Sequence, residues 1–246
     1  MNLVDLWQRH AGEPVHVLGN GWSLDRIPDG VTIGVNRVWR LGIPDYWYTI
    51  DQDVYAELAS PDARPDELLE ADWVVSPNII PSVVPRDGVR FAPPDERILL
   101  TPLARIDDRP GLFPPEAVTR QFCEAGTFAG QRLRPGRAPK PGALWGENSS
   151  VDRCLHLALI LGASEVHLHG VDLALEPGTG RRRFCDPVPT TGLQRDEAEK
   201  STGQLIVHRR NLERFARAWR ERVRLVSHSP AAGLEGWEAT CPRVNG

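Results

Sequence analysis

The chain has 246 residues, of which 33 are acidic and 29 basic, and its formal net charge is −4. With 41% hydrophobic and 25% charged residues it has a globular composition, which excludes a disordered or fibrous chain. The acidic excess argues against broad, charge-driven binding of nucleic acid. No apolar run approaches the ~20 residues of a membrane span. The N-terminus has no secretion signal, so we expect a cytoplasmic protein.

Three short β-rich runs near the N-terminus each end in polar residues. The first, residues 15–18, runs directly into the glycine turn of residues 19–21. The second ends at Asn36, and the third, residues 46–50, ends at the acidic triplet 51–53. Because the carboxyl ends of parallel strands share one edge of a sheet, this pattern predicts an α/β fold with a functional edge there.

The middle of the chain, about residues 77–142, is rich in proline. Proline removes a backbone donor and disfavours helix for the residue before it. We therefore expect an irregular insertion of loops and short strands, with room for one helix near Pro114–Gly126.

Regular structure returns near residue 148. Apolar residues at helical spacing predict a helix that ends at Gly162, with Ser149 and Asp152 as a capping-box start. A strand over residues 166–169, a polar loop, a helix over about 205–223 and a strand over 224–227 follow. This order is typical of a right-handed α/β unit, and we expect a single domain over residues 1–246.

The glycine turn and the Asn36 side chain are the first candidate ligand contacts. Gly19 and Gly21 would let a phosphate or ribose approach the backbone, and Asn20 and Ser23 add donors. A tight strand–helix turn explains the same pattern equally well. Asn36 either bonds a loop carbonyl or reaches a nucleobase or ribose.

Acidic residues supply two further candidates. Asp51 and Asp53 can hold a magnesium or manganese ion on a diphosphate, because hard cations prefer oxygen ligands. Helix capping by Asp53 is the alternative. Asp172, after the strand over 166–169, can hold a ribose hydroxyl or cap the following loop.

A helix start and several histidines complete the candidates. Asn148, Ser149 and Ser150 begin a helix, where free N–H groups and the helix dipole favour an anion, although a simple cap needs nothing more. His208 can move a proton near neutral pH, although a single histidine near a helix start is more often structural or solvated. His167 and His169 alternate along a strand with no third ligand nearby in sequence, and we expect interior or capping positions for them.

These motifs together resemble the sialyltransferase-like superfamily. That superfamily contains the bacterial CMP-sialic acid-dependent sialyltransferases, the 6-hydroxymethylpterin diphosphokinase-like proteins and the motility-associated flagellin glycosyltransferases. The resemblance rests on residues 17–24, 34–36, 148–150 and 158–172. It implies a Rossmann-like, mostly parallel sheet with helices on both faces, and a mobile lid over about residues 173–207.

The resemblance also implies roles for individual residues. His208, in a His-x-x-Asn stretch with Asn211, would be the general base, and Asp172 would close the site. The lid lacks the tyrosines of the sialyltransferases, and its Arg181, Arg182 and Arg183 would neutralise a leaving phosphate instead. The nucleotide would be held by Gly19, Asn20, Gly21, Ser23, Asn36, Asn148, Ser149, Ser150 and Asp172.

We therefore expect a nucleotide-dependent transferase, and specifically a glycosyltransferase that moves a sugar from a nucleotide-sugar donor to an acceptor hydroxyl. The acceptor can be a glycan, a small metabolite or a modified nucleobase. Magnesium-dependent diphosphoryl transfer to a hydroxymethylpterin, with Asp51 and Asp53 on the metal, is the alternative enzyme. A catalytically silent nucleotide-binding protein is a third possibility, and a homo-oligomer is compatible with the resemblance.

Overall fold

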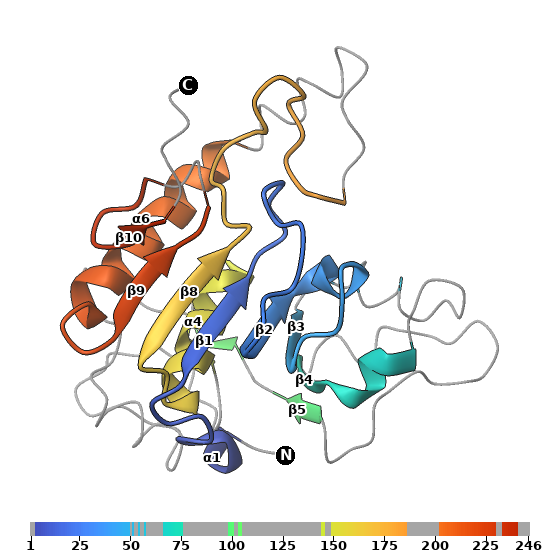
Figure 1. Cartoon of the computed structure of the whole chain (residues 1–246), viewed down its shortest axis with the longest axis vertical. Helices are drawn as coiled ribbons and strands as arrows, with labels where there is room; N and C mark the ends of the chain where they lie inside the picture. The colour runs from blue at the N-terminus through green and yellow to red at the C-terminus, as the bar shows by residue number, and fades with distance from the viewer. Residues whose placement is uncertain are drawn as a thin grey trace, which may run out of the picture.

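The computed structural model is built around one parallel sheet (Figure 1). It describes residues 3–49, 51, 54, 57, 66–75, 98–100, 103–104, 144–145, 149–185, 202–229 and 233–240. Eight strands lie in the order β10-β9-β8-β1-β2-β3-β4-β5, and β6 and β7 form a separate pair. Their bounds are β1 Pro14–Leu18, β2 Val31–Val35, β3 Tyr46–Thr49, β4 Asp72–Val75, β5 Ile98–Leu100, β6 Leu103–Ala104, β7 Leu144–Trp145, β8 Glu165–His169, β9 Arg224–Ser227 and β10 Glu238–Ala239.

The chain order reverses between β1 and β8. From β1 the sheet grows through β2 to β5 on one side, and from β8 it grows through β9 to β10 on the other. In parallel α/β sheets a crevice opens outside the carboxyl ends of the strands at such a reversal. The predicted α/β, Rossmann-like fold is confirmed, and its topology places a crevice beyond Leu18 and His169.

Helices cover the sheet unequally. The two longest, α4 (Ser150–Leu161) and α6 (Thr202–Trp219), lie behind the sheet in Figure 1. The short η1 (Asn36–Arg40) packs on the opposite face, where its Val38 meets Leu18 of β1. The described part also contains α1 (Leu3–Leu6) and η2 (Asp66–Glu70). None of these helices is long and apolar enough to cross a membrane.

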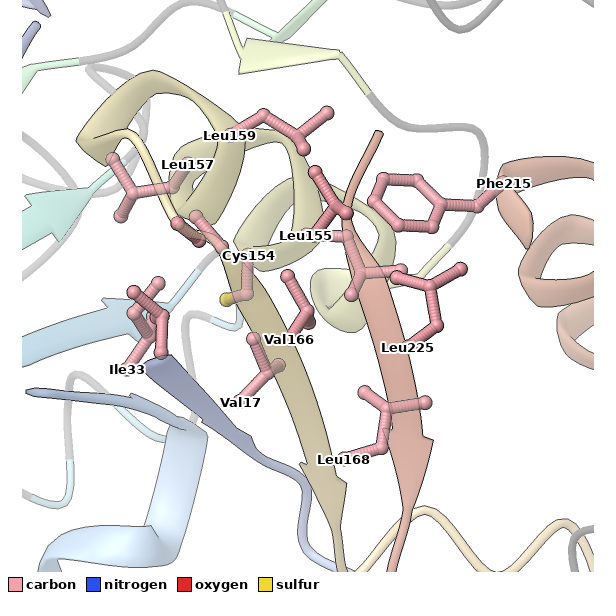
Figure 2. Packing of buried hydrophobic residues seen from close by; sticks show 14 of the residues in the cluster. Val17, Ile33, Cys154, Leu155, Leu157, Leu159, Val166, Leu168, Phe215 and Leu225 are labelled. Carbon is pink, nitrogen blue, oxygen red and sulfur yellow. The ribbon is translucent and has the colours of Figure 1, made fainter. Parts of the chain in front are cut away.

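Helix α4 forms the centre of the core. The Ser149 hydroxyl accepts a hydrogen bond from the Val151 N–H at 3.1 Å, and Gly162, at φ 88°, ends the helix, as predicted. The periodicity predicts one buried face, but every residue from Asp152 to Leu161 is buried. The reason is that more than the sheet covers α4: α1 and β7 also contact it, and Phe215 of the neighbouring α6 packs in the same cluster as Leu155 (Figure 2).

Other predicted boundaries differ modestly or fall outside the description. Helix α6 ends at Trp219, so Val223 lies in the turn before β9. Residues 202–207, the end of the predicted lid, are the first turns of α6. Within the predicted insertion the structure describes only 98–100 and 103–104, and the expected helix at 114–126 lies outside the described residues. The insertion, the lid and the single domain stay predictions.

Four histidines gather on the sheet face opposite α4. His16 of β1 and His169 of β8 are hydrogen-bonded through Nδ1 and Nε2 at 3.0 Å. His167 Nδ1 and His228 Nε2 are 2.9 Å apart, and the His169 and His228 rings stack with centroids 4.1 Å apart. The sequence shows no third possible ligand near His167 and His169, but the neighbouring strands bring His16 and His228 beside them.

Burial keeps part of this cluster uncharged. Desolvation, followed by the neighbouring histidines, lowers the pKa of His16 to about 4 and that of His169 to about 3. Burial also lowers the pKa of His228. Glu165 accepts a hydrogen bond from one edge of the cluster, at His167 Nε2, at 3.1 Å.

Acidification from pH 7.5 to 5 should therefore lower the free energy of unfolding. Unfolded histidines take up a proton near pH 6.5, whereas His16 and His169 stay neutral in the fold until about pH 4 and 3. Stability is thus full above pH 6.5 and falls as pH decreases, by at most about 1.4 kcal/mol per pH unit for each histidine before solvent screening. Urea denaturation measures the slope. His169→Gln should flatten it, and an unchanged slope would contradict the assignment.

Candidate functional site

A cavity of about 530 Å³ opens at the carboxyl edge of the sheet, at the reversal between β1 and β8. The glycine turn, the end of β2, the start of α4, the segment after β8 and the start of α6 all contribute to its wall. It is lined by Gly19, Asn20, Gly21, Val35, Asn36, Asp51, Ser149, Ser150, Val151, Gly170, Val171, Asp172, Leu173, Ala174, Arg182, Arg183, Leu205, Val207 and His208. The glycine turn, Asn36 and the serines at the start of α4, to which the resemblance assigns one nucleotide, therefore line the same cavity.

The glycines of the first turn are needed for packing. A Cβ on Gly19 would lie 2.5 Å from the Gly170 carbonyl oxygen, and one on Gly21 would overlap both that oxygen and the Asp172 carboxylate. Their N–H groups donate to the carbonyls of His169 and Gly170 at 2.8 and 2.6 Å. These donors are thus used within the protein, and a tight turn accounts for both glycines. The turn leads towards strand β2, however, and not into the helix of the predicted strand–helix turn.

Asp172 connects the segment after β8 to the segment after β1. Ser23 donates to the Asp172 carboxylate twice, from its backbone N–H at 2.9 Å and from its hydroxyl. Burial raises the pKa of Asp172, and these two hydrogen bonds partly oppose the shift. Ser23 does not line the main cavity; it holds the carboxylate that does.

Asn36 and Asp51 form a hydrogen-bonded pair on the wall. The Asn36 amide donates to Asp51 at 2.6 Å and accepts from the Thr49 hydroxyl at 2.9 Å, and its backbone carbonyl accepts from Trp47 Nε1 at 2.6 Å. Asn36 has φ 50°, a left-handed conformation that asparagine tolerates. Its side chain thus connects the ends of β2 and β3, through a carboxylate and a hydroxyl and not through the loop carbonyl of the structural alternative.

The amino end of α4 reaches the cavity through Ser149, Ser150 and Val151. The start of this helix carries the positive end of the helix dipole, which favours an anion. Asn148 and Asp53, also predicted as site residues, lie outside the described residues.

The three loop arginines separate into two groups. Arg181 pairs with Glu176 at 3.0 Å and is not part of the cavity wall. Arg182 and Arg183 do line the cavity, and Arg183 pairs through its backbone with Gly21 in an antiparallel bridge. The ion pair of Arg181 therefore holds the loop together, and the next two residues contribute to the cavity wall.

His208 lies in the second turn of α6 and is half-buried on the cavity wall. Burial, and then the nearby positive charge of Arg182, lowers its pKa below the usual value. The imidazole is therefore neutral at pH 7 and able to accept a proton.

Asn211 of the His-x-x-Asn stretch does not reach the cavity. Its amide donates to the buried Asp152 carboxylate of α4 at 2.9 Å. The sequence identifies Asn211 through the resemblance and Asp152 as part of a helix cap. It does not predict that they pair, because 59 positions separate them.

Sequence reasoning missed the apolar part of the wall. Leu173, Leu205 and Val207 line the cavity, and Leu173 has φ 55°, which is rare for a branched side chain. No local signal identifies these residues. Within the described ranges, no group of three or more His, Cys, Asp or Glu side chains is arranged to hold a metal ion. Asp51 is the one predicted metal ligand that the structure places on the cavity.

Comparisons with known proteins return one structural likeness. No family model matches the chain, and a search of curated proteins finds no match. A similar solved structure is that of the MAf glycosyltransferase from Magnetospirillum magneticum AMB-1, with a TM-score of 0.47 and 18% sequence identity. The match covers 95% of this chain but 34% of that one, so this chain spans about a third of its length. A likeness of this size identifies neither site residues nor a substrate.

Gly21→Ala should destabilise the protein by roughly 1–3 kcal/mol, because the new methyl overlaps the backbone of Gly170 and the Asp172 carboxylate. Chemical denaturation measures the loss. Gly42→Ala is the matched control, since a Cβ there first meets the end of the Ile27 side chain, at 3.1 Å. Equal stability of the two variants would show that Gly21 is packed against Gly170 and Asp172 less tightly than the structure indicates.

Proposed function

We propose that this protein is a nucleotide-dependent glycosyltransferase that moves a sugar from a nucleotide-sugar donor to an acceptor hydroxyl. The proposal rests on one observation: His208, Arg182 and Arg183 line the same cavity. The lowered pKa of His208 suits it to accept a proton, and the arginines carry positive charge. A base for the acceptor and charge for the leaving group are the two functions that this transfer needs. The resemblance to the sialyltransferase-like superfamily supports the same reaction class.

The cavity can accommodate the nucleotide part of a donor. Its volume lies within the ~300–1,000 Å³ typical of small-molecule sites. Asn20 Oδ1 is buried and accepts no hydrogen bond from the described residues, so it can take one from a ribose hydroxyl or base amino group. Asp172 can accept another. Anionic phosphate is favoured by Arg182, Arg183 and the start of α4.

The transfer step then moves one proton and one sugar, and it adds negative charge to the nucleotide phosphate. Neutral His208 takes the proton of the acceptor hydroxyl as that oxygen bonds to the anomeric carbon. The bond from this carbon to the phosphate oxygen breaks, and the nucleotide leaves with the electron pair. Arg182 and Arg183 neutralise the charge that develops on the leaving phosphate.

Diphosphoryl transfer is the second candidate, favoured by the Asp51 carboxylate on the cavity wall. Asp51 would hold a magnesium or manganese ion there, and the ion would supply positive charge for a diphosphate. Thermal-shift titration with CMP, UDP, ATP and nucleotide sugars, each with and without Mg²⁺, separates the candidates, because a ligand stabilises the state that it binds. Stabilisation only by ATP with Mg²⁺ would favour the kinase. No stabilisation by any of them would contradict both.

His208→Ala should lower turnover at least about a hundredfold, because the general base is lost. Donor binding, measured by calorimetry, should stay near normal, since the phosphate contacts remain. His208→Gln, which keeps much of the side-chain volume, serves as the control for packing. Wild-type turnover in both variants would remove the base assignment.

Arg182→Ala should move the acidic limb of the kcat profile to higher pH. Only neutral His208 can accept the proton, and its pKa lies below the usual value partly because of the Arg182 charge. Loss of that charge raises the pKa, so activity is lost at a higher pH as the solution is acidified. Arg217→Ala, an exposed change farther along α6, should leave the limb in place. An unmoved limb in Arg182→Ala would contradict the coupling.

A further inference from the structure

We propose that Asn211 and Asp152 are positioning residues that set the place of His208 in the cavity. The inference rests on the proposed role of His208 as base and adds to it. The Asn211 amide donates to the Asp152 carboxylate at 2.9 Å, with Asn211 3% and Asp152 1% exposed. This bond joins α6 to the first turn of α4, and both helices line the cavity.

The bond is directional, whereas the other buried side chains described for α6 are apolar; the Leu212 carbonyl also accepts a hydrogen bond, from Trp237 Nε1 at 3.0 Å, but this bond does not reach α4. The other buried side chains among the described residues of α6 are Leu212, Phe215, Ala216 and Trp219. Apolar packing tolerates small rotations and slides of a helix, because it depends on buried area more than on direction. A buried amide–carboxylate hydrogen bond does not tolerate such movements, since a displaced helix would take the Asn211 amide away from the Asp152 carboxylate.

His208 lies where this constraint acts most directly. It precedes Asn211 by three residues, which is about 4.5 Å along the helix axis and nearly the same face. On its other side the helix leaves the core, with Ile206 57% and Val207 37% exposed. Asn211 is thus the first fully buried residue after His208, and the turn that carries the imidazole is held mainly from its carboxyl side.

The same bond fixes the opposite wall. Asp152 follows Val151 directly, and Val151, Ser150 and Ser149 form the part of α4 that lines the cavity. A movement at Asp152–Asn211 would therefore change the distance between His208 and the start of α4. The distance from His208 to the start of α4 is the distance from the base to the proposed phosphate position. Loss of the Asp152–Asn211 bond should therefore change kcat more than donor binding.

The test uses the full chain with 13C-labelled histidine and follows the His208 titration by NMR, assigned with His208→Gln. Asn211→Ala should move the pKa of His208 up toward its usual value as the imidazole becomes more hydrated. It should also lower kcat about tenfold with donor affinity unchanged. Asn211→Asp, of nearly the same shape, should do the same, because two carboxylates then face each other at neutral pH.

The reciprocal exchange provides the rescue. In the double variant Asp152→Asn with Asn211→Asp, an amide again faces a carboxylate, but the amide now lies on α4 and the carboxylate on α6. This double variant should restore both the titration and kcat. Leu212→Ala, a buried apolar change on the same turn, is the control for lost stability alone: it should lower the melting temperature yet leave the His208 titration near wild type.

Each outcome decides the matter. A wild-type His208 titration in Asn211→Asp, or a double variant that stays as defective as the single ones, would overturn the positioning role. If Asn211→Ala does not fold, the isosteric Asn211→Asp and its rescue carry the same test. The titration needs no substrate, so it separates this inference from the proposed function. If His208→Ala keeps full turnover, the proposed function falls even where the titration behaves as expected.

Discussion

The contact between the turn after β1 and the segment after β8 is the constraint on which the rest depends. Gly19 and Gly21 approach the backbone of Gly170 too closely for any side chain, and Ser23 closes the contact by donating to Asp172. Because β1 and β8 are the strands at which the sheet reverses its order, this contact forms one wall of the crevice. The cavity forms because the carboxyl ends of β1 and β8 are held together, while the segments that follow these strands lead to opposite sides of the sheet.

The chemistry of the cavity comes from elements that reach it from different layers. The helix layer behind the sheet supplies the start of α4 and the imidazole of His208, while the loop after β8 supplies Arg182 and Arg183. Burial and the arginine charge together keep that imidazole neutral. The acid–base state of the site is therefore a consequence of how the helix and the loop pack, and no single segment carries it.

Much of the fold could be predicted because its signals are local. Short runs with β-branched residues mark β1 and β2, and a serine cap with a closing glycine marks α4. The candidate site was partly predictable for the same reason, since polar residues that follow parallel strands share an edge. The roles of these residues were less predictable. A glycine after a strand has the same pattern whether a phosphate or a backbone approaches it, and here Gly170 occupies that space.

The amino-acid sequence by itself determined where strands and helices form and which polar residues lie at their ends, because backbone preference and periodicity act over a few neighbours. Tertiary structure alone decided the pairs. Ser23 meets Asp172 across 149 positions, His16 meets His169 across 153, and Asn211 meets Asp152 across 59. No local pattern encodes such partners, since their meeting depends on strand order and helix packing, which only the assembled chain establishes.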